Sequence, residues 1–206
     1  MVKIALFGTS ADPPTAGHQT ILRWLSYRFD LVTVWAAENP FKSHKASLEH
    51  RVRMLRLLIE DMESSRETSN ISRRNVFLEQ DLSSLRTLET LEKAKLRWGN
   101  AEYTLVVGSD LLTQLSRWYR IEDLLRQVQL LVIPRPGYAI DETSLRSVQQ
   151  LGAKIAIASL TGLDVSSTSY REQGDSNALT PLVIDYIHQQ HLYKCQDVTQ
   201  KSLYIH

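Results

Sequence analysis

Residues 2–18 read VKIALFGTSADPPTAGH, and this stretch decides the fold. A short apolar run, residues 2–7, stops at Gly8, which is typical of a buried β-strand. A turn-rich segment with two consecutive prolines follows it. Apolar residues then recur at helical spacing from Ile21 to Phe29. The opening of the chain therefore predicts a strand, a loop and a helix.

The same order of elements recurs along the chain. We expect further strands at residues 31–36, 76–78, 103–107, 130–133 and 154–158. Helical spacing predicts helices at residues 48–62, 86–98 and 121–128 and from residue 181 onward. Because several strands are apolar along their whole length, both of their faces must be covered. The sequence therefore predicts a single α/β domain over residues 1–206, with a doubly wound, Rossmann-like, mostly parallel sheet and helices on both faces.

Composition excludes several classes of protein. The formal net charge is +1, so no overall field recruits nucleic acid or an anionic membrane surface. There is one cysteine, Cys195, and no Cys/His pattern predicts a structural zinc site. No apolar run approaches the roughly 18–20 residues that span a bilayer. We expect a cytoplasmic protein without nucleic-acid or membrane partners, and the sequence leaves its oligomeric state, including a homo-oligomer, open.

The loop after the first predicted strand has features of a phosphate site. Gly8 and Gly17 permit a close approach of the backbone to a bulky ligand. His18 falls at the start of the next helix, where backbone N–H groups and the helix dipole favour anions. A phosphate there would meet the imidazole, the Thr15 hydroxyl and backbone donors together. The alternative is a tight turn with a capping Thr and a surface His, and the loop matches neither the P-loop nor the dinucleotide-binding pattern.

A second polar cluster, DVSSTSYR, occupies residues 164–171. Hydroxyls followed by Arg171 at the start of a helix suit a polyphosphate, because the guanidinium offers a charged fork of donors. The alternative is that Ser166 or Ser167 caps the helix and Arg171 is a solvated charge. Both clusters follow predicted strands, and ligands in such folds bind beyond the carboxyl ends of the strands.

These two segments resemble the motifs of the nucleotidylyltransferase superfamily. Residues 8–18 resemble its signature GxFDPxHxGH, and Thr15 to His18 fit the Thr form of the (H/T)xGH motif. Ala11 stands where the family usually has Phe. Residues 166–171 match the second motif, ISSTxxR, from its first Ser onward. The two matches stand in the right order at opposite ends of the chain.

Intermediate landmarks resemble bacterial nicotinate mononucleotide adenylyltransferases in particular. They are a shortened NPxxxPHK loop at residues 39–45, a TxxTL helix at 87–91, GxD…W…RPG at 108–137 and a terminal PxxVxxYIxxxxLY at 181–193. The resemblance covers nearly the whole chain. It implies transfer of the adenylyl group of ATP to nicotinate mononucleotide, giving deamido-NAD and pyrophosphate in NAD biosynthesis.

The resemblance also implies roles for individual residues. It makes His18 and Thr15 the catalytic residues. Its ATP-binding residues are Gly8, Thr9, Ser10, Gly17, His18, Ser166, Ser167, Thr168 and Arg171. Its acceptor-binding residues are Asn39, Lys45, Arg51, Thr87, Asp110 and Trp118, with Lys42 as a further phosphate-neutralising candidate. Mg²⁺ would be bound mainly through the ATP phosphates, without a metal site made by protein side chains.

Each landmark has a simpler explanation, and other functions remain open. Trp118 is alternatively a half-buried core residue, Asp110 a helix cap, and Arg51 a residue on a solvated helix face. A related enzyme would use nicotinamide mononucleotide, phosphopantetheine or another phosphorylated acceptor, or would transfer CMP. A non-catalytic nucleotide-binding module is a remote alternative, and an oxidoreductase lacks its glycine fingerprint. Backbone N–H groups can distinguish nicotinate from nicotinamide, and they leave no trace in the sequence.

Overall fold

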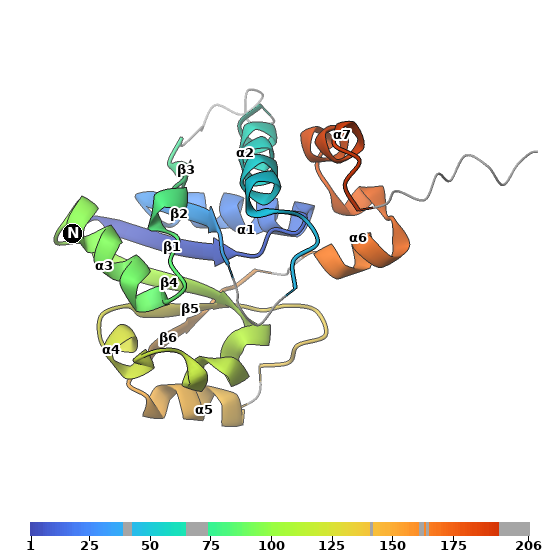
Figure 1. The fold of residues 1–206 in the computed structure, drawn as a ribbon. Coiled ribbons are helices and arrows are strands. Elements are labelled where there is room, and N and C mark those ends of the chain that lie inside the picture. Colours follow the sequence, from blue (N-terminus) through green and yellow to red (C-terminus); the bar gives the residue numbers. More distant parts are fainter. Residues whose placement is uncertain (39–42, 65–73, 141, 161–162, 164, 194–206) are drawn as a thin grey trace, which may run out of the picture.

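A computed structural model describes residues 1–38, 43–64, 74–140, 142–160, 163 and 165–193 of the chain (Figure 1). Six strands form one sheet. They are β1 (Lys3–Thr9), β2 (Leu31–Ala36), β3 (Val76–Leu78), β4 (Glu102–Gly108), β5 (Gln129–Ile133) and β6 (Lys154–Ile157). All six coincide, within one or two residues at their ends, with strands predicted from apolar runs.

Helices follow the strands in alternation. The α-helices are α1 (Ala16–Ser26), α2 (Leu48–Ser64), α3 (Thr87–Trp98), α4 (Ile121–Leu125), α5 (Glu142–Gln150), α6 (Ser167–Gln173) and α7 (Pro181–Gln189). Three 3₁₀ helices join them, η1 (Gln80–Leu82), η2 (Ser109–Arg117) and η3 (Ser176–Ala178). Sequence reasoning did not predict α5, η1 or η3, and it considered a helix after Gly108 only as the alternative role of Asp110. In α5 the apolar residues are Leu145 and Val148 alone, and of the two only Val148 is buried, so the apolar stripe spans a single turn.

The strand order is β3-β2-β1-β4-β5-β6, and each neighbouring pair is parallel. The chain first builds one half of the sheet outward from β1, and then returns beside β1 to build the other half from β4. The connections leaving β1 and β4 therefore diverge, and in doubly wound folds this switch point, at the carboxyl ends of the strands, is where the ligand crevice is expected. The predicted doubly wound parallel fold is confirmed.

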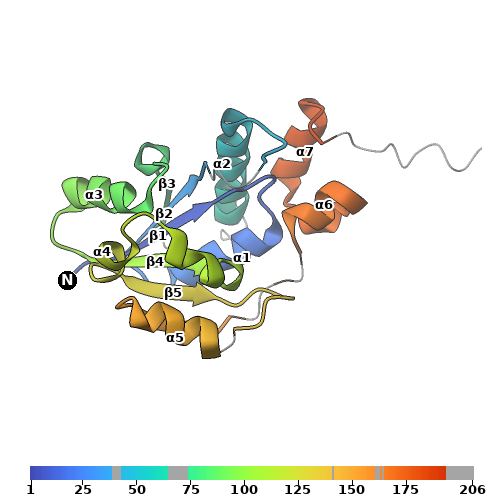
Figure 2. The same ribbon diagram turned by 60° about the horizontal axis from the view of Figure 1, so that its bottom comes forward.

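Two hydrophobic cores cover the two faces of the sheet (Figures 1 and 2). One core packs α1, α2, α6 and α7 against strand residues such as Ala5 and Phe7. The other packs η2, α3, α4 and α5 against residues such as Ile4 and Leu6. Successive strand residues point to opposite faces. Both sets of side chains are therefore buried, which explains why the strands are apolar along their whole length.

Among the residues that the structure describes, no helix has both the length and the apolar character needed to cross a membrane.

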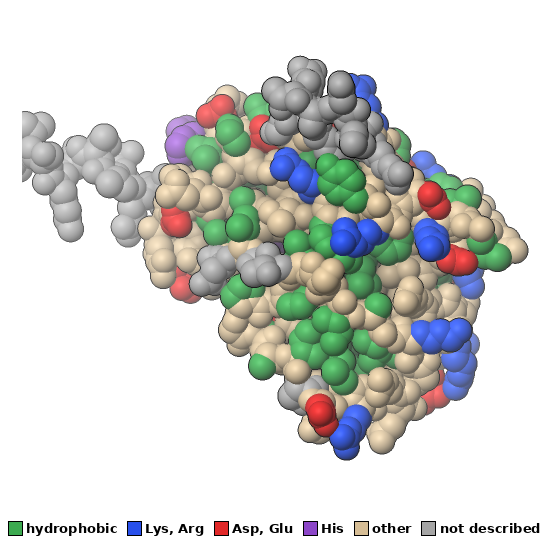
Figure 3. All heavy atoms as spheres, turned by 180° about the vertical axis from the view of Figure 1, so that it is seen from behind, with side chains coloured by type: hydrophobic (Ala, Val, Ile, Leu, Met, Phe, Trp, Pro, Cys, Tyr) green, Lys and Arg blue, Asp and Glu red, His purple; other side chains and the backbone are tan. Residues whose placement is uncertain are grey.

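On the face seen in Figure 3, hydrophobic side chains gather in a group bordered by charged ones. Exposed apolar groups of this kind often mark a surface that binds a partner.

Candidate functional site

The two polar clusters of the sequence meet in the structure. The Ser167 hydroxyl, at the start of α6, donates to the main-chain oxygen of Pro13 in the β1–α1 loop at 2.7 Å. Arg171, one helical turn further on, donates through Nη1 to the main-chain oxygen of Asp12. Segments more than 150 residues apart thus form one wall at the carboxyl ends of the strands. The sequence placed both clusters at this rim, and the structure brings them into contact.

His18 is held on both sides of its ring. Its Nδ1 accepts from the main-chain N–H of Thr15 at 3.0 Å, and the Thr15 hydroxyl lies 2.9 Å from the same nitrogen. Its Nε2 lies 2.9 Å from the Thr9 hydroxyl at the end of β1. Because a backbone N–H can only donate, Nδ1 is the acceptor, and a neutral ring then carries its proton on Nε2. The ring therefore directs an N–H donor toward the end of β1.

Asp12 joins three segments beneath this wall. Its Oδ2 accepts from the Lys45 main-chain N–H at 2.7 Å, and its Oδ1 accepts from the Ala46 N–H at 3.1 Å and from the Tyr193 hydroxyl at 2.7 Å. The Asp12 residue is 4% exposed. Burial raises the pKa of Tyr193, and the bond to Asp12 and the charge of Asp12 add to this effect. Asp12 therefore supports the loop, and both of its oxygens are already occupied.

Arg51 lies below the site and joins two of its loops. Its Nη1 donates to the main-chain oxygens of Ser10 and Ala37 at 2.9 and 2.8 Å, and the residue is 2% exposed. Burial lowers the pKa of the guanidinium, and the negative charge of Asp12 opposes that shift. Sequence reasoning expected Arg51 at the acceptor. The structure shows it bracing the loops that follow β1 and β2.

The glycines at the site make room for protein atoms. A Cβ built on Gly8 would lie 2.8 Å from three atoms of the Trp35 indole, so the missing side chain admits that ring. A Cβ on Gly17 would lie 3.3 Å from both Thr15 Oγ1 and Val165 Cγ2. The sequence predicted that a bulky ligand approaches the backbone at both positions. In the described structure the neighbours are Trp35 and the segment that leads into α6.

The first turn of α6 combines a cap with a charged donor. The Ser166 hydroxyl oxygen accepts from the N–H of Ser169 at 3.0 Å, as an N-cap does. The Nη2 of Arg171 donates to the Thr168 hydroxyl at 3.2 Å. Arg171 and Thr168 are thereby held together on the side of α6 that faces the β1–α1 loop. Ser166 fits the simpler explanation of a capping residue.

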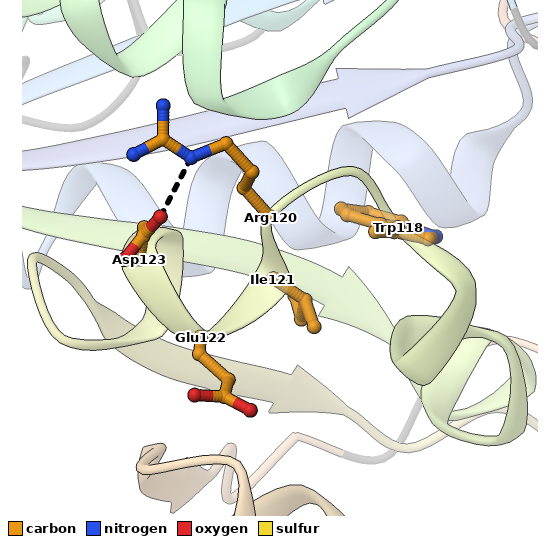
Figure 4. A pocket seen from close by; sticks show the side chains of 5 residues that line it. All are labelled: Trp118, Arg120, Ile121, Glu122 and Asp123. Carbon is orange, nitrogen blue, oxygen red and sulfur yellow. Dashed lines mark hydrogen bonds and ion pairs between the residues drawn. The ribbon is translucent and has the colours of Figure 1, made fainter.

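The other half of the crevice is built by the loops after β4 and β5. Asp110 Oδ2 accepts from Arg135 Nη1 at 2.9 Å. Trp118, at the end of η2, borders a hollow whose other lining residues are Arg120, Ile121, Glu122 and Asp123 (Figure 4). An ion pair between Arg120 Nε and Asp123 Oδ2, 2.7 Å long, braces that hollow (Figure 4). Trp118 is half-buried, so one part of its ring is accessible.

The remaining acceptor candidates fall in different places. Thr87 is the first residue of α3. The guanidinium of the preceding residue, Arg86, lies 4.1 Å from the centroid of the Tyr119 ring, so the segments carrying Thr87 and Trp118 are in contact. Lys45 is exposed at the edge of the Asp12 cluster. Asn39 and Lys42 lie outside the described residues.

The site also depends on three residues that sequence reasoning did not place in it. Asp12, Arg135 and Tyr193 make the contacts that order the loops, yet each stood in the sequence only as part of a quoted motif. Their partners are main-chain or side-chain groups 25 to 181 residues away. A local pattern carries no information on such contacts. The signal available in the sequence was that each of these three residues lies within a motif resembling those of the nucleotidylyltransferase superfamily.

The possible metal ligands of the site indicate how a metal ion would be held. Within the described ranges, no three His, Cys, Asp or Glu side chains gather in a group suited to a metal ion. Asp12 uses both carboxylate oxygens for protein donors, and Arg135 holds one oxygen of Asp110. These residues fit Mg²⁺ only as an ion coordinated by substrate oxygens and water, which is common for this cation.

A doubly wound parallel sheet with His, Thr and Arg donors near its switch point makes this chain an α/β protein of the Rossmann-like class. Residues 6–173 match the model of the cytidylyltransferase-like family, and the chain belongs to that family. A probable nicotinate-nucleotide adenylyltransferase from Synechocystis sp. is 44% identical over 94% of this chain and 100% of its own length. The nicotinate-nucleotide adenylyltransferase of Bacillus subtilis is 28% identical, with the same two coverages.

Solved structures show the same fold. The nicotinic acid mononucleotide adenylyltransferase of Plasmodium falciparum complexed with NaAD superposes with a TM-score of 0.75 and 23% identity. The match covers 95% of this chain and 98% of that one. The same enzyme complexed with APC gives a TM-score of 0.72 and 24% identity. At these identities the likeness establishes the architecture of the chain.

Proposed function

We propose that the protein transfers the adenylyl group of ATP to nicotinate mononucleotide, producing deamido-NAD and pyrophosphate. The observation that carries the proposal is the contact between the His18 loop and the Arg171 helix at the switch point of the sheet. The Synechocystis relative, 44% identical along nearly the whole chain, supports the choice of reaction. A polyphosphate at this wall would face donors from both ends of the sequence.

The chemistry we propose is an in-line attack by the 5′-phosphate of the mononucleotide on the α-phosphorus of ATP. A new P–O bond forms to the α-phosphorus as the bond to the β-phosphate oxygen breaks, and pyrophosphate leaves. The attacking phosphate is already an anion, so the reaction requires no strong general base. Catalysis then consists mainly of positioning the reactants and stabilising the charge that develops.

His18 is the proposed donor to the α-phosphate. The main-chain N–H of Thr15 holds Nδ1 as an acceptor, so Nε2–H is the group the ring offers to a ligand. That N–H lies beside the Thr9 hydroxyl, which keeps the ring in place in the absence of a ligand. A fixed donor needs no reorganisation as negative charge builds up in the transition state. Thr15 acts here by orienting the ring.

Arg171 and Thr168 are the proposed donors to the β- and γ-phosphates. An arginine side chain has five N–H donors, and two of the bonds seen here go to Asp12 and Thr168. The remaining donors of the fork suit the leaving pyrophosphate. Ser167 uses its hydroxyl to join α6 to the β1–α1 loop, so its proposed contribution is to hold these donors in place. Mg²⁺ supplies further charge neutralisation through the phosphate oxygens.

The acceptor side of the proposal rests on Asp110, Trp118 and Thr87. The accessible face of Trp118 suits a planar, electron-poor pyridine ring. Asp110 offers a carboxylate to hydroxyl donors of a ribose. Exposed Lys45 is placed to neutralise phosphate charge, and Arg51 supports the loops from below.

A direct assay tests the proposal. Purified protein with Mg²⁺ and ATP is offered nicotinate mononucleotide or nicotinamide mononucleotide, and pyrophosphate release is followed. We expect release with nicotinate mononucleotide and weaker release with the nicotinamide form. Replacing ATP with CTP tests cytidylyl transfer, and adding phosphopantetheine tests a different acceptor. ATP binding without pyrophosphate release from any acceptor would identify a non-catalytic nucleotide-binding module.

A further inference from the structure

The ion pair between Arg135 and Asp110 lies where β4 and β5 end, on the open side of the crevice. Arg135 Nη1 is 2.9 Å from Asp110 Oδ2. The Asp110 side chain is 14% exposed, and that of Arg135 is 39% exposed. The Arg135 side of this pair is accessible to water, and screening by solvent there limits what the pair contributes to stability. The ion pair also fixes the orientation of the Asp110 carboxylate, and this is the effect to be explained.

Hydrogen bonds between the loops after β4 and β5 hold Arg135 in place. The Ser109 hydroxyl accepts from the main-chain N–H of Arg135 at 3.0 Å and donates to the main-chain oxygen of Tyr138 at 2.9 Å. The Arg135 guanidinium carbon lies 5.8 Å from the centroid of the Tyr138 ring. Both the backbone and the side chain of Arg135 are thus held relative to the end of β4. This arrangement fixes the guanidinium before any ligand binds.

Gly108 allows the two side chains to close over the end of β4. A Cβ at this position would lie 2.3 Å from Asp110 Oδ1 and 2.9 Å from Arg135 Cδ. The first distance is far below van der Waals contact, so a larger residue would displace the Asp110 carboxylate. The absence of a side chain at residue 108 and the hold on Oδ2 therefore set the orientation of Oδ1 together.

We propose that Arg135 is a positioning residue that aims Asp110 at a ribose hydroxyl of a bound nucleotide, an inference that rests on the proposed function. With Oδ2 held by Arg135, Oδ1 is the oxygen directed to a ligand. A carboxylate oxygen accepts well from a hydroxyl donor. Both substrates carry a ribose with 2′- and 3′-hydroxyls, and either one supplies the chemistry that Oδ1 recognises.

The test compares Arg135→Ala, Arg135→Lys and wild type with complete and truncated substrates. Steady-state rates are measured with ATP and nicotinate mononucleotide, and with their 2′-deoxy and 3′-deoxy forms. We expect Arg135→Ala to raise KM for the substrate that Asp110 contacts by about tenfold, the lower range for a hydrogen bond to a charged group, with kcat within about twofold of wild type. Arg135→Lys should recover part of the loss. With the analogue lacking the contacted hydroxyl, wild type and Arg135→Ala should have equal KM, which also identifies the substrate.

Two controls separate positioning from a general loss of structure. Arg146→Ala removes a similar but well-exposed ion pair, that of Arg146 and Glu142 on α5, and should leave both kinetic constants unchanged. In an Asp110→Ala background, Arg135→Ala should have no further effect on KM. A penalty that is the same for complete and deoxy substrates, or no penalty at all, would overturn the proposal.

The positioning role of Arg135 and the proposed function can be refuted independently of each other. If wild type releases no pyrophosphate with any acceptor, the proposed reaction fails. Equilibrium binding of ATP, the mononucleotide and their deoxy forms to the same variants then decides the role of Arg135. Weaker binding of one complete nucleotide by Arg135→Ala, absent for its deoxy form, supports positioning. Equal binding of all forms by wild type and variant contradicts it.

Discussion

The loops on the two sides of the switch point differ in how many hydrogen bonds connect them and in how deeply the bonded groups are buried. On the β1 side, Asp12 accepts from three donors, two in the β2–α2 loop and one on Tyr193 after α7. Arg171 and Ser167 donate to main-chain oxygens of the β1–α1 loop. On the β4 side, one partly exposed ion pair and one serine hydroxyl connect the loops. Asp12 and Arg51 on the β1 side are almost fully buried, whereas Arg135 on the β4 side is partly exposed.

This difference matches the demands of the proposed reaction. Charge develops on the transferring phosphate, and donors that are fixed before the reaction stabilise it most effectively. Rings and ribose hydroxyls must instead enter and leave. The comparison predicts that substitutions on the β1 side lower kcat or stability, whereas substitutions on the β4 side mainly raise KM.

The largest expected effect is on turnover. His18→Ala removes the proposed Nε2–H donor and should lower kcat by about 10²–10³-fold, the usual loss for one such donor. KM for ATP should change far less. Pyrophosphate release at saturating substrate measures the effect. His50→Ala, which alters a histidine bonded to Tyr186 between α2 and α7, is the matched control and should keep normal turnover. Near-normal kcat in folded His18→Ala would remove this residue from the catalytic role.

The next effect is on stability. Asp12→Asn replaces one acceptor oxygen with an amide donor that faces groups which themselves donate. We expect the free energy of unfolding in urea to fall by about 3 kcal/mol, since removing a partner from buried donors costs about 1–3 kcal/mol for each. Asp30→Asn is the control, because Asp30 accepts from the Lys3 N–H at an exposed position. An equal loss in the two variants would contradict the bracing role of Asp12.

A smaller loss of stability tests the packing beneath the site. Gly8→Ala would force a methyl group against the Trp35 indole, so the free energy of unfolding should fall by about 1–3 kcal/mol. Gly17→Ala is the comparison, because its Cβ meets neighbours at 3.3 Å and requires smaller adjustments. Thermal unfolding of both variants measures the difference. A larger loss in Gly17→Ala would show that the α6 contact, not Trp35, limits space on the β1 side.

The smallest effect concerns pH. Burial raises the pKa of Tyr193 in the folded protein, whereas the pKa of a tyrosine in an unfolded chain is about 10. The stabilisation by the Tyr193 hydroxyl is therefore complete below that pH and is lost as the pH rises further. Above it, the free energy of unfolding of wild type should fall more steeply than that of Tyr193→Phe, by up to about 1.4 kcal/mol per pH unit. Parallel urea titrations between pH 8 and 11, values chosen to bracket about 10, measure both slopes, and identical slopes would refute the assignment.

Much of the architecture followed from local patterns. The inner strands β1, β2, β4 and β5 were visible because both of their faces are largely buried, which leaves a mostly apolar run. α2 was equally visible from its stripe of buried residues such as Leu55, Ile59 and Met62. α5 was missed because its stripe consists of Leu145 and Val148 alone and spans a single turn. Strand order and the switch point between β1 and β4 are properties of the connections, and the sequence only indicated their general class.

For the site, the sequence by itself determined the residue types and their place at the ends of strands. It supplied the His18 loop and the Ser167–Arg171 segment, because short motifs report local chemistry. Only the tertiary structure decided that these segments touch, that Arg51 braces loops from below, and that Arg135 holds Asp110. The physical reason is that such contacts depend on how strands separated by tens of residues are ordered in the sheet, and a buried polar group takes whichever partner that order brings within hydrogen-bonding distance.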